Sequence, residues 1–232
     1  MSRVRFTIRS VNIGRPQPWE WAEIGRSSIE KHAVPGPVEV DALGLAGDQV
    51  SDTRHHGGVD QAVYAFARED LDWWADELGT TLRDGQFGEN LTTSGYDVNE
   101  AEVGEHWRVG SALLEVASVR TPCNDFKGWM GECGLDNTAW VKRFTAEARP
   151  GPYLRVLEAG EVSSGDAAEV VHRPGHGVTV SQMFRALMGE KELLPRLLEV
   201  EGMVEEARAR AERYVAAGNG SGVVLPPRNP VI

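Results

Sequence analysis

The sequence predicts a mainly β protein of the α+β class, with an antiparallel barrel or sandwich to about residue 174 and three helices after it. Three observations support this prediction. Apolar residues alternate strictly with charged ones at the N-terminus, short apolar runs recur along the body, and the apolar spacing becomes helical after Pro174. We therefore expect a β-rich domain over 1–174, a three-helix extension over 175–217 and a flexible tail over 218–232.

The first strand is predicted from residue 3, because Val4, Phe6 and Ile8 share one face while arginines occupy the other. Further short strands are expected at Val38–Val40, Ala62–Ala67, His106–Val109, Ala112–Val119, Tyr153–Leu157 and Glu169–Val171. Gly110-Ser111 separates two of these runs, and glycine at the first central position is typical of a type II′ hairpin turn. The two strands beside this turn should pair.

One peripheral helix is expected within the β-rich body. The segment Arg68–Leu78 carries apolar residues at helical spacing, which predicts an amphipathic helix that packs on the strands. Gly79 follows directly and is placed to end this helix.

The C-terminal part is predicted to be helical. Thr179 and Gln182 form a capping box, which indicates that a helix begins there. Two more helical segments are expected at Lys191–Val200 and Met203–Ala217, before a tail rich in glycine, serine and proline.

The composition is that of a soluble globular protein. The 232 residues are 41% hydrophobic and 25% charged, and the apolar runs are far shorter than the ~20 residues that cross a membrane. The two cysteines and the lack of a secretory start favour the reducing cytoplasm. A net charge of −11 opposes binding to the phosphate backbone of nucleic acids. We therefore expect neither a membrane nor a nucleic acid as partner.

The first candidate site is a polar cluster that follows Gly47-Asp48. It combines two imidazoles, a guanidinium and a carboxylate with paired glycines: Arg54, His55, His56, Gly57, Gly58 and Asp60. Such a loop suits an anionic ligand, because glycines let backbone N–H groups approach it and Arg54 can grip a phosphate. An ordinary turn with solvated histidines is the alternative. Metal binding by both histidines is not favoured, since neighbouring side chains on a strand point to opposite faces.

The second cluster is Gly85-Gln86-Phe87-Gly88-Glu89-Asn90-Leu91-Thr92-Thr93. Asn90 is its candidate ligand contact, because an amide both donates and accepts hydrogen bonds. The same residue types also satisfy the backbone of ordinary loops, so this reading stays open.

The third cluster is the end of the strand Ala112–Val119, which runs directly into Arg120-Thr121-Pro122-Cys123. Proline cannot continue the ladder, so Cys123 should be presented from a fixed turn, with Arg120 favouring its thiolate form. Cys133 is instead expected to be a buried small hydrophobe. A disulfide is disfavoured by the compartment, and the spacing of further ligands that zinc requires is absent.

Read together and in order, these clusters resemble the MOSC-domain family, named for the C-terminal domain of molybdenum cofactor sulfurase, in its YiiM-like branch. The matching segments are GLAGDQVSDTRHHGGVDQAVYAF, GQFGENLTTSGY, VGEHWRVGSALLEVASVRTPC and GPYLRVLEAGEVSSGD. The helical end resembles the small three-helix extension of that branch. The resemblance covers most of residues 35 to 215.

The resemblance implies a β-barrel-like fold with one essential cysteine. Cys123 would be catalytic, either as the ligand of molybdenum in a pterin cofactor or as a sulfur carrier. The cofactor-binding residues would be Arg54, His55, His56, Gly57, Gly58, Asp60, Asn90, Arg120 and Thr121. Related members reduce N-hydroxylated compounds, hydroxylaminopurines included, which implies a detoxifying oxidoreductase. One departure concerns a lysine. The branch has a lysine two residues after the cysteine, whereas the first lysine after Cys123 in this chain is Lys127.

The partners implied are a small-molecule substrate and a separate electron donor, because the chain has neither a dinucleotide fingerprint nor an iron–sulfur cysteine set. The alternative is that Cys123 carries a persulfide received from a desulfurase. No pyridoxal phosphate is expected in this chain. A third hypothesis, a DNA-binding helical end, ranks last, because acidic residues outnumber basic ones from His176 to Ala217.

Overall fold

A closed β-barrel forms the body of the molecule in the computed structural model, which describes residues 4–219. Its seven strands are β1 (Arg5–Gly14), β7 (Val63–Ala67), β8 (Leu91–Ser94), β9 (His106–Val109), β10 (Ala112–Val119), β11 (Pro152–Glu158) and β13 (Ala167–His172). They follow the order β13-β9-β10-β11-β7-β8-β1, and the pairing of β1 with β13 closes the barrel. All these pairs are antiparallel except β7–β8. The prediction of a mainly β, α+β fold is confirmed, as a barrel and not a sandwich.

All the predicted strands except Val38–Val40 lie in this barrel. Phe6 and Ile8 of β1 point into the core while Arg5 and Arg9 are solvent-exposed, as the alternation predicts. The hairpin between β9 and β10 is also confirmed, because Val109 pairs with Ala112 across a two-residue turn. Gly110 has the positive φ, +53°, that the first position of a type II′ turn requires.

Several very short strands extend the barrel and have no periodicity that a sequence would reveal. β4 (Lys31–Ala33) pairs with β1, and β2 (Gln17–Pro18) pairs with β3 (Arg26–Ser27). A small second sheet consists of β5 (Val38–Asp41), β6 (Gly44–Leu45) and β12 (Gly160–Val162). Of these, only β5 was expected.

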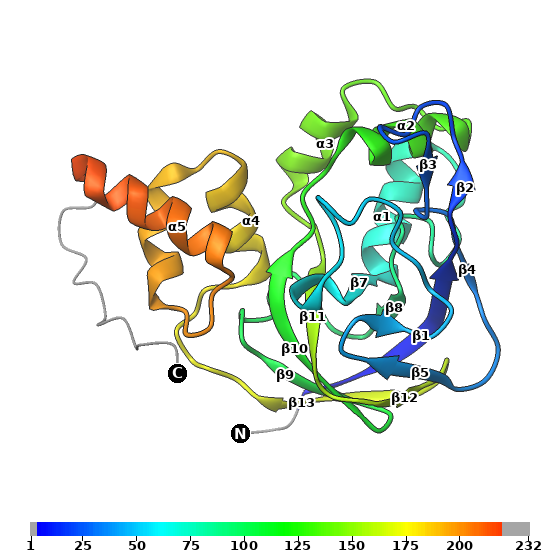
Figure 1. Cartoon of the computed structure of the whole chain (residues 1–232), viewed down its shortest axis with the longest axis horizontal. Helices are drawn as coiled ribbons and strands as arrows, with labels where there is room; N and C mark the ends of the chain where they lie inside the picture. The colour runs from blue at the N-terminus through cyan, green and yellow to red at the C-terminus, as the bar shows by residue number, and fades with distance from the viewer. Residues whose placement is uncertain (1–3, 220–232) are drawn as a thin grey trace.

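Three helices, not one, pack on the barrel (Figure 1). The predicted α1 (Arg68–Leu78) is confirmed, and Gly79 ends it in the left-handed conformation at φ +63°. The helices α2 (Asn124–Glu132) and α3 (Trp140–Glu147) were not predicted. Aromatic side chains of all three helices meet around Phe87, whose ring lies 5.1 to 6.3 Å from those of Phe126, Trp140, Phe144 and Trp74.

The C-terminal extension lies beside the barrel (Figure 1). It begins with α4 (Val180–Met188), where the Thr179 hydroxyl accepts a hydrogen bond from the N–H of Gln182 at 3.3 Å, as predicted. The second helix, η2 (Lys191–Glu199), is a 3₁₀-helix; Pro195 inside it lacks the N–H that an α-helix needs. The third is α5 (Glu205–Tyr214), continued by the π-turn η3 (Val215–Asn219).

Of the tail predicted over 218–232, residues 220–232 lie outside the described part of the chain. Within residues 4–219, every helix is too short or too polar to reach across a bilayer. The core is continuous, because buried side chains of the barrel, of the helices that pack on it and of the extension belong to one cluster.

Candidate functional site

A cavity of about 870 Å³, counted with its open mouth, collects residues from widely separated parts of the chain. Its lining includes Lys31 from β4, Tyr64 from β7, Asn90 ahead of β8, and Arg120 and Cys123 after β10. The loop between β6 and β7 supplies a further side of the lining, from Asp48 to Ala62.

Cys123 occupies the N-cap position of α2. Its Sγ atom accepts a hydrogen bond from the N–H of Phe126 at 3.4 Å, and its side chain is partly exposed on the cavity wall. The strand β10 ends at Val119 as predicted, so the cysteine is held between a barrel strand and a helix. Helix α2 is fixed in turn by Trp21, which packs so closely on Gly128 that an added Cβ would lie 2.6 Å from the indole ring.

Arg120 is a buried cation without an acidic partner. Arg120 is only 6% exposed. Its Nη1 donates a hydrogen bond to the Tyr153 hydroxyl at 3.2 Å, and its guanidinium carbon lies 4.8 Å from the centroid of the Phe126 ring, over its face. Burial acts to lower the pKa of Arg120, but the Tyr153, Cys123 and Tyr64 side chains outweigh it and keep the pKa above its ordinary value. The group is therefore charged at every physiological pH.

Two buried polar atoms on this cavity have no hydrogen-bond partner within the described residues. One is the donor Nε of Arg120, and the other is the acceptor Oε1 of Gln61. Because unpaired buried polar atoms are costly, Arg120 and Gln61 are candidate contacts for a ligand in the cavity that they line. The charge of Arg120 would suit an anionic ligand.

Lys31 and Asp48 form a buried ion pair in the same cavity. Asp48 also accepts hydrogen bonds from the N–H of Gly14 at 2.7 Å and from Nδ2 of Asn90 at 2.9 Å. Asn90 in turn accepts a hydrogen bond from the N–H of Tyr64 at 3.1 Å, so its amide links the ion pair to the barrel. Burial lowers the pKa of Lys31 although Asp48 acts to raise it. Lys31 was missed by the sequence analysis.

The histidine loop contributes only part of its predicted residues to the cavity. His56 and Gly57 line it, and burial followed by the charge of Arg120 lowers the pKa of His56. Arg54 is largely exposed and lies 3.6 Å from Asp52, while His55 and Gly58 face solvent. These residues lie in a turn, not a strand, and the two histidines still diverge.

Two other predicted residues are not part of the cavity lining. Asp60 forms an ion pair of 2.6 Å with Arg155 of β11, and Thr121 is solvent-exposed. The structure thus brings together His56, Gly57, Asn90, Arg120 and Cys123. It leaves Arg54, His55, Gly58, Asp60 and Thr121 outside. In residues 4–219, no three His, Cys, Asp or Glu side chains converge as a metal cluster would need.

Glu89, directly before Asn90, is fully buried and makes hydrogen bonds to the Gly85–Thr92 segment. Its carboxyl group accepts hydrogen bonds from the N–H of Phe87 at 3.0 Å and from the hydroxyl of Thr92 at 2.9 Å, as well as from the N–H of Gly85. Burial raises the pKa of Glu89 to about 7, against these hydrogen bonds.

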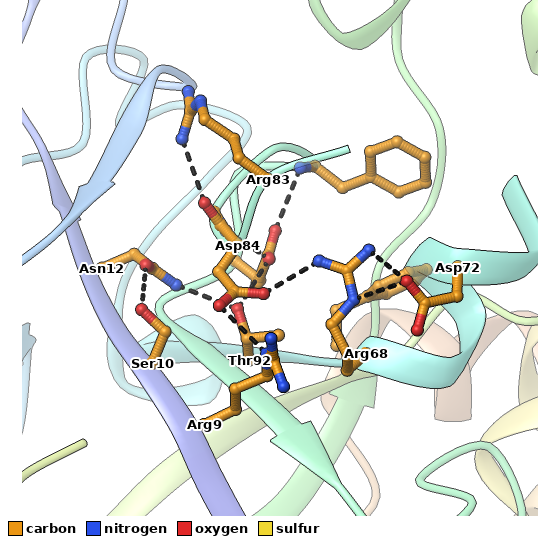
Figure 2. A network of polar contacts seen from close by, with 12 residues as sticks. Arg9, Ser10, Asn12, Arg68, Asp72, Arg83, Asp84 and Thr92 are labelled. Carbon is orange, nitrogen blue, oxygen red and sulfur yellow. Dashed lines mark hydrogen bonds and ion pairs between the residues drawn. The ribbon is translucent and has the colours of Figure 1, made fainter. Parts of the chain in front are cut away.

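The polar network around the loop continues through β1. Figure 2 shows Asn12 between Ser10 and Thr92, with hydrogen bonds of 2.7 and 3.1 Å. In the same view Asp84 accepts from both Arg9 and Arg68, at 3.3 and 2.9 Å. These contacts hold the Gly85–Thr93 segment in place beneath the cavity.

Cys133 lies at the other end of α2, outside the cavity lining. Its sulfur accepts a hydrogen bond from Nε2 of Gln86 at 3.2 Å, and burial raises the pKa of its thiol. Both cysteines are free and partly buried. The two thiols of the chain therefore differ in position, and only that of Cys123 faces the cavity.

Comparisons with known proteins agree with this arrangement. The MOSC domain model matches residues 52–169, which contain all the motif residues from Arg54 to Cys123. The uncharacterized protein YflK of Bacillus subtilis is 30% identical over 181 residues, 78% of this chain and 80% of that protein. Protein YiiM of Escherichia coli is 36% identical over 150 residues, 63% of this chain and 65% of YiiM.

Two further similarities concern a longer protein and a solved structure. A protein named reductase from Gibberella moniliformis is 30% identical over 180 residues, which are 75% of this chain but 30% of the reductase. The crystal structure of YiiM from Geobacillus stearothermophilus matches with a TM-score of 0.73 at 22% identity, over 90% of this chain and 98% of that one. The barrel fold is therefore shared.

Proposed function

Because this chain belongs to the MOSC domain family, in its YiiM-like branch, we propose that it binds a molybdenum–pterin cofactor and reduces N-hydroxylated small molecules such as hydroxylaminopurines. The observation that carries this proposal is that Cys123 and the buried Arg120, whose Nε has no hydrogen-bond partner among the described residues, line the same cavity. The relative named a reductase supports the reductive direction.

The residues present fit such a cofactor. Thiolate sulfur is a soft ligand, so Cys123 suits molybdenum that is also held by the sulfur atoms of a pterin. The unpaired Nε of Arg120 and the ammonium of Lys31 suit an anionic phosphate group, and the unpaired Oε1 of Gln61 suits a ring N–H. The sequence predicted a phosphate contact at Arg54. Because Arg54 is not part of the cavity lining, we propose Arg120 and Lys31 for this contact instead.

The proposed overall reaction converts R–NH–OH, two protons and two electrons into R–NH₂ and water. The bound molybdenum would supply the two-electron chemistry, and a separate protein would donate the electrons. The chain itself holds protons at Nζ of Lys31 and on the ring of His56, both on the cavity wall.

A persulfide on Cys123 is the alternative, and it uses the same sulfur. We rank it second, because a persulfide on Cys123 gives no role to the unpaired Oε1 of Gln61. Incubation with a cysteine desulfurase and mass spectrometry distinguishes the two, since a carrier gains the mass of sulfur on Cys123.

Molybdenum and pterin content provide the decisive test. We expect wild-type protein from a host that makes the cofactor to contain close to one molybdenum per chain, and the Cys123→Ser variant to lose it at least tenfold. Elemental analysis measures the metal, and the fluorescence of the oxidised pterin measures the organic part.

The matched control is Cys133→Ser, the same substitution at the other end of the same helix. This variant should keep its molybdenum, because Cys133 does not line the cavity. Wild-type protein free of molybdenum, or equal metal content in both serine variants, would refute the proposed function.

A further inference from the structure

Two large hydrophobic side chains at the cavity are exposed to solvent. Leu43 is 71% exposed and Val50 is 39% exposed, and both belong to the cavity lining. Single exposed apolar residues are common on proteins, but here two of them share one binding cavity. We call Leu43 and Val50 the apolar lip.

Leu43 stands at the tip of the hairpin between β5 and β6. Asp41 pairs with Gly44, so Ala42 and Leu43 are the two turn residues, a place where polar residues and glycine are usual. The carboxylate of Asp41 accepts a hydrogen bond from the N–H of Leu43 at 2.8 Å, which fixes the turn. The leucine is thus held in a defined position although its side chain has little to pack on.

The hairpin is pressed against the barrel at its base. A Cβ added to Gly44 would lie 2.5 Å from the carbonyl oxygen of Ala62, so only glycine permits this approach. The adjoining Leu45 and Ala62 are buried and also line the cavity. The apolar surface therefore continues from Leu43 inward.

Val50 lines the same cavity beside the histidine turn. A Cβ added to Gly57 would lie 3.3 to 3.5 Å from the side-chain carbons of Val50, so the two residues are in close contact. Charged and amide side chains line the same cavity: Lys31 of β4, Asn90, Arg120, Asp125 of α2, and Asp48, Gln49, Asp52 and Gln61 of the loop that carries Val50. The cavity thus offers an exposed apolar surface in addition to its charged groups.

We infer that the apolar lip selects the substrate, and that it does so for N-hydroxy compounds whose nitrogen is attached to a flat aromatic ring of low polarity. This inference rests on the proposed function. The ring covers Leu43 and Val50, which removes their exposed surface from water, while the polar N–OH group enters beside Cys123. Small or strongly polar N-hydroxy compounds lack this contribution and bind more weakly.

The test has a binding arm that does not depend on turnover. The fluorescent aromatic amine 1-naphthylamine, a compound of the product class, is titrated into the wild type, Leu43→Ser and Val50→Ser. Each substitution should weaken binding roughly tenfold, because it removes one apolar contact from the ring. The control is Leu157→Ser, which changes a leucine that is 39% exposed, as Val50 is, and lies outside the cavity lining.

A kinetic arm compares N-phenylhydroxylamine with N-methylhydroxylamine on protein that contains molybdenum, with chemically reduced benzyl viologen as the electron donor. Lip variants should lose roughly tenfold in the ratio of kcat/KM between the two compounds, and Leu157→Ser should not change it. Substitution of an exposed leucine or valine by serine leaves the core intact. Because Leu43→Ser and Val50→Ser should show the same loss, each variant serves as a check on the other.

The outcomes separate the two proposals. Equal naphthylamine affinity in wild type and lip variants, or no binding by the wild type, overturns the inference about the lip. Failure to reduce either hydroxylamine overturns the proposed function, while the binding arm still decides whether the lip recognises an aromatic ring.

Discussion

Arg120 brings a positive charge into the interior without an acidic partner, and such a group costs stability unless a ligand compensates it. We expect Arg120→Met to unfold with a free energy equal to that of the wild type or up to about 1 kcal/mol higher. Cofactor content should fall at least tenfold, because the anionic group loses its guanidinium. Urea unfolding of the cofactor-free protein and pterin analysis measure the two effects.

Arg149 provides the contrasting case for this prediction. Its Nη1 lies 2.6 Å from the buried carboxylate of Asp70, outside the cavity of Cys123. The variant Arg149→Met leaves that carboxylate with Asn99 alone, so it should cost about 2 kcal/mol and keep the cofactor. Should Arg120→Met prove as destabilising as Arg149→Met, Arg120 would be a structural residue and not an anion receptor.

Glu89 makes the stability of the protein depend on pH. Its pKa is raised from the ordinary 4.5 to about 7, so the folded state binds a proton more tightly than the unfolded state does. Its stabilising effect is complete below about pH 4.5 and is lost as the pH rises through about 7. We expect this loss to be about 3 kcal/mol, and Glu89→Gln to abolish it.

The measurement is urea unfolding of both proteins at several values between pH 4.5 and 8. Other titrating groups are common to the two proteins, so the difference between their curves isolates Glu89. The glutamine loses one acceptor toward Phe87, but this cost is the same at every pH. Parallel curves for the two proteins would contradict the assignment.

At the scale of elements, the sequence predicted those with a clear local signal. α1 has helical apolar spacing and a terminal glycine, and the β9–β10 hairpin has a glycine at its turn. α2 has no such signal, because it contains Gly128 and Gly131, which weaken a helix. It forms because Trp21 and the aromatic core pack on it, and those contacts come from distant parts of the chain.

In the candidate site, too, a residue's place was predictable where a local pattern indicates it and not where contacts from distant parts of the chain decide it. Cys123 and Arg120 follow a strand and a proline, so their place at the end of β10 was predictable. Lys31 reaches the cavity only because β4, three residues long, pairs with β1. No local pattern indicates that pairing. Conversely, Asp60 was predicted as a cofactor-binding residue, yet its carboxylate forms an ion pair with Arg155 of β11.

At the scale of the whole molecule, the last barrel strand ends at His172 and α4 begins at Val180, but the two parts are closely joined. The N–H groups of Val180 and Ser181 donate to the carbonyls of Ala101 and Asn99, both at 2.9 Å. Phe184 of α4 packs edge-on against Phe144 of α3, with ring centroids 6.2 Å apart. We therefore propose that the extension folds with the barrel as one cooperative unit.

Tryptophan fluorescence tests this proposal, because all seven tryptophans precede residue 175 and so report on the body alone. Phe184→Ala removes a fully buried ring from the extension and should cost about 3 kcal/mol. In a cooperative unit, Phe184→Ala lowers the urea midpoint measured by fluorescence and the midpoint measured by circular dichroism by the same amount. The control variant Lys191→Ala, at an exposed residue, should change neither midpoint. An extension that unfolded independently would lower only the helical signal and leave the fluorescence midpoint at its wild-type value.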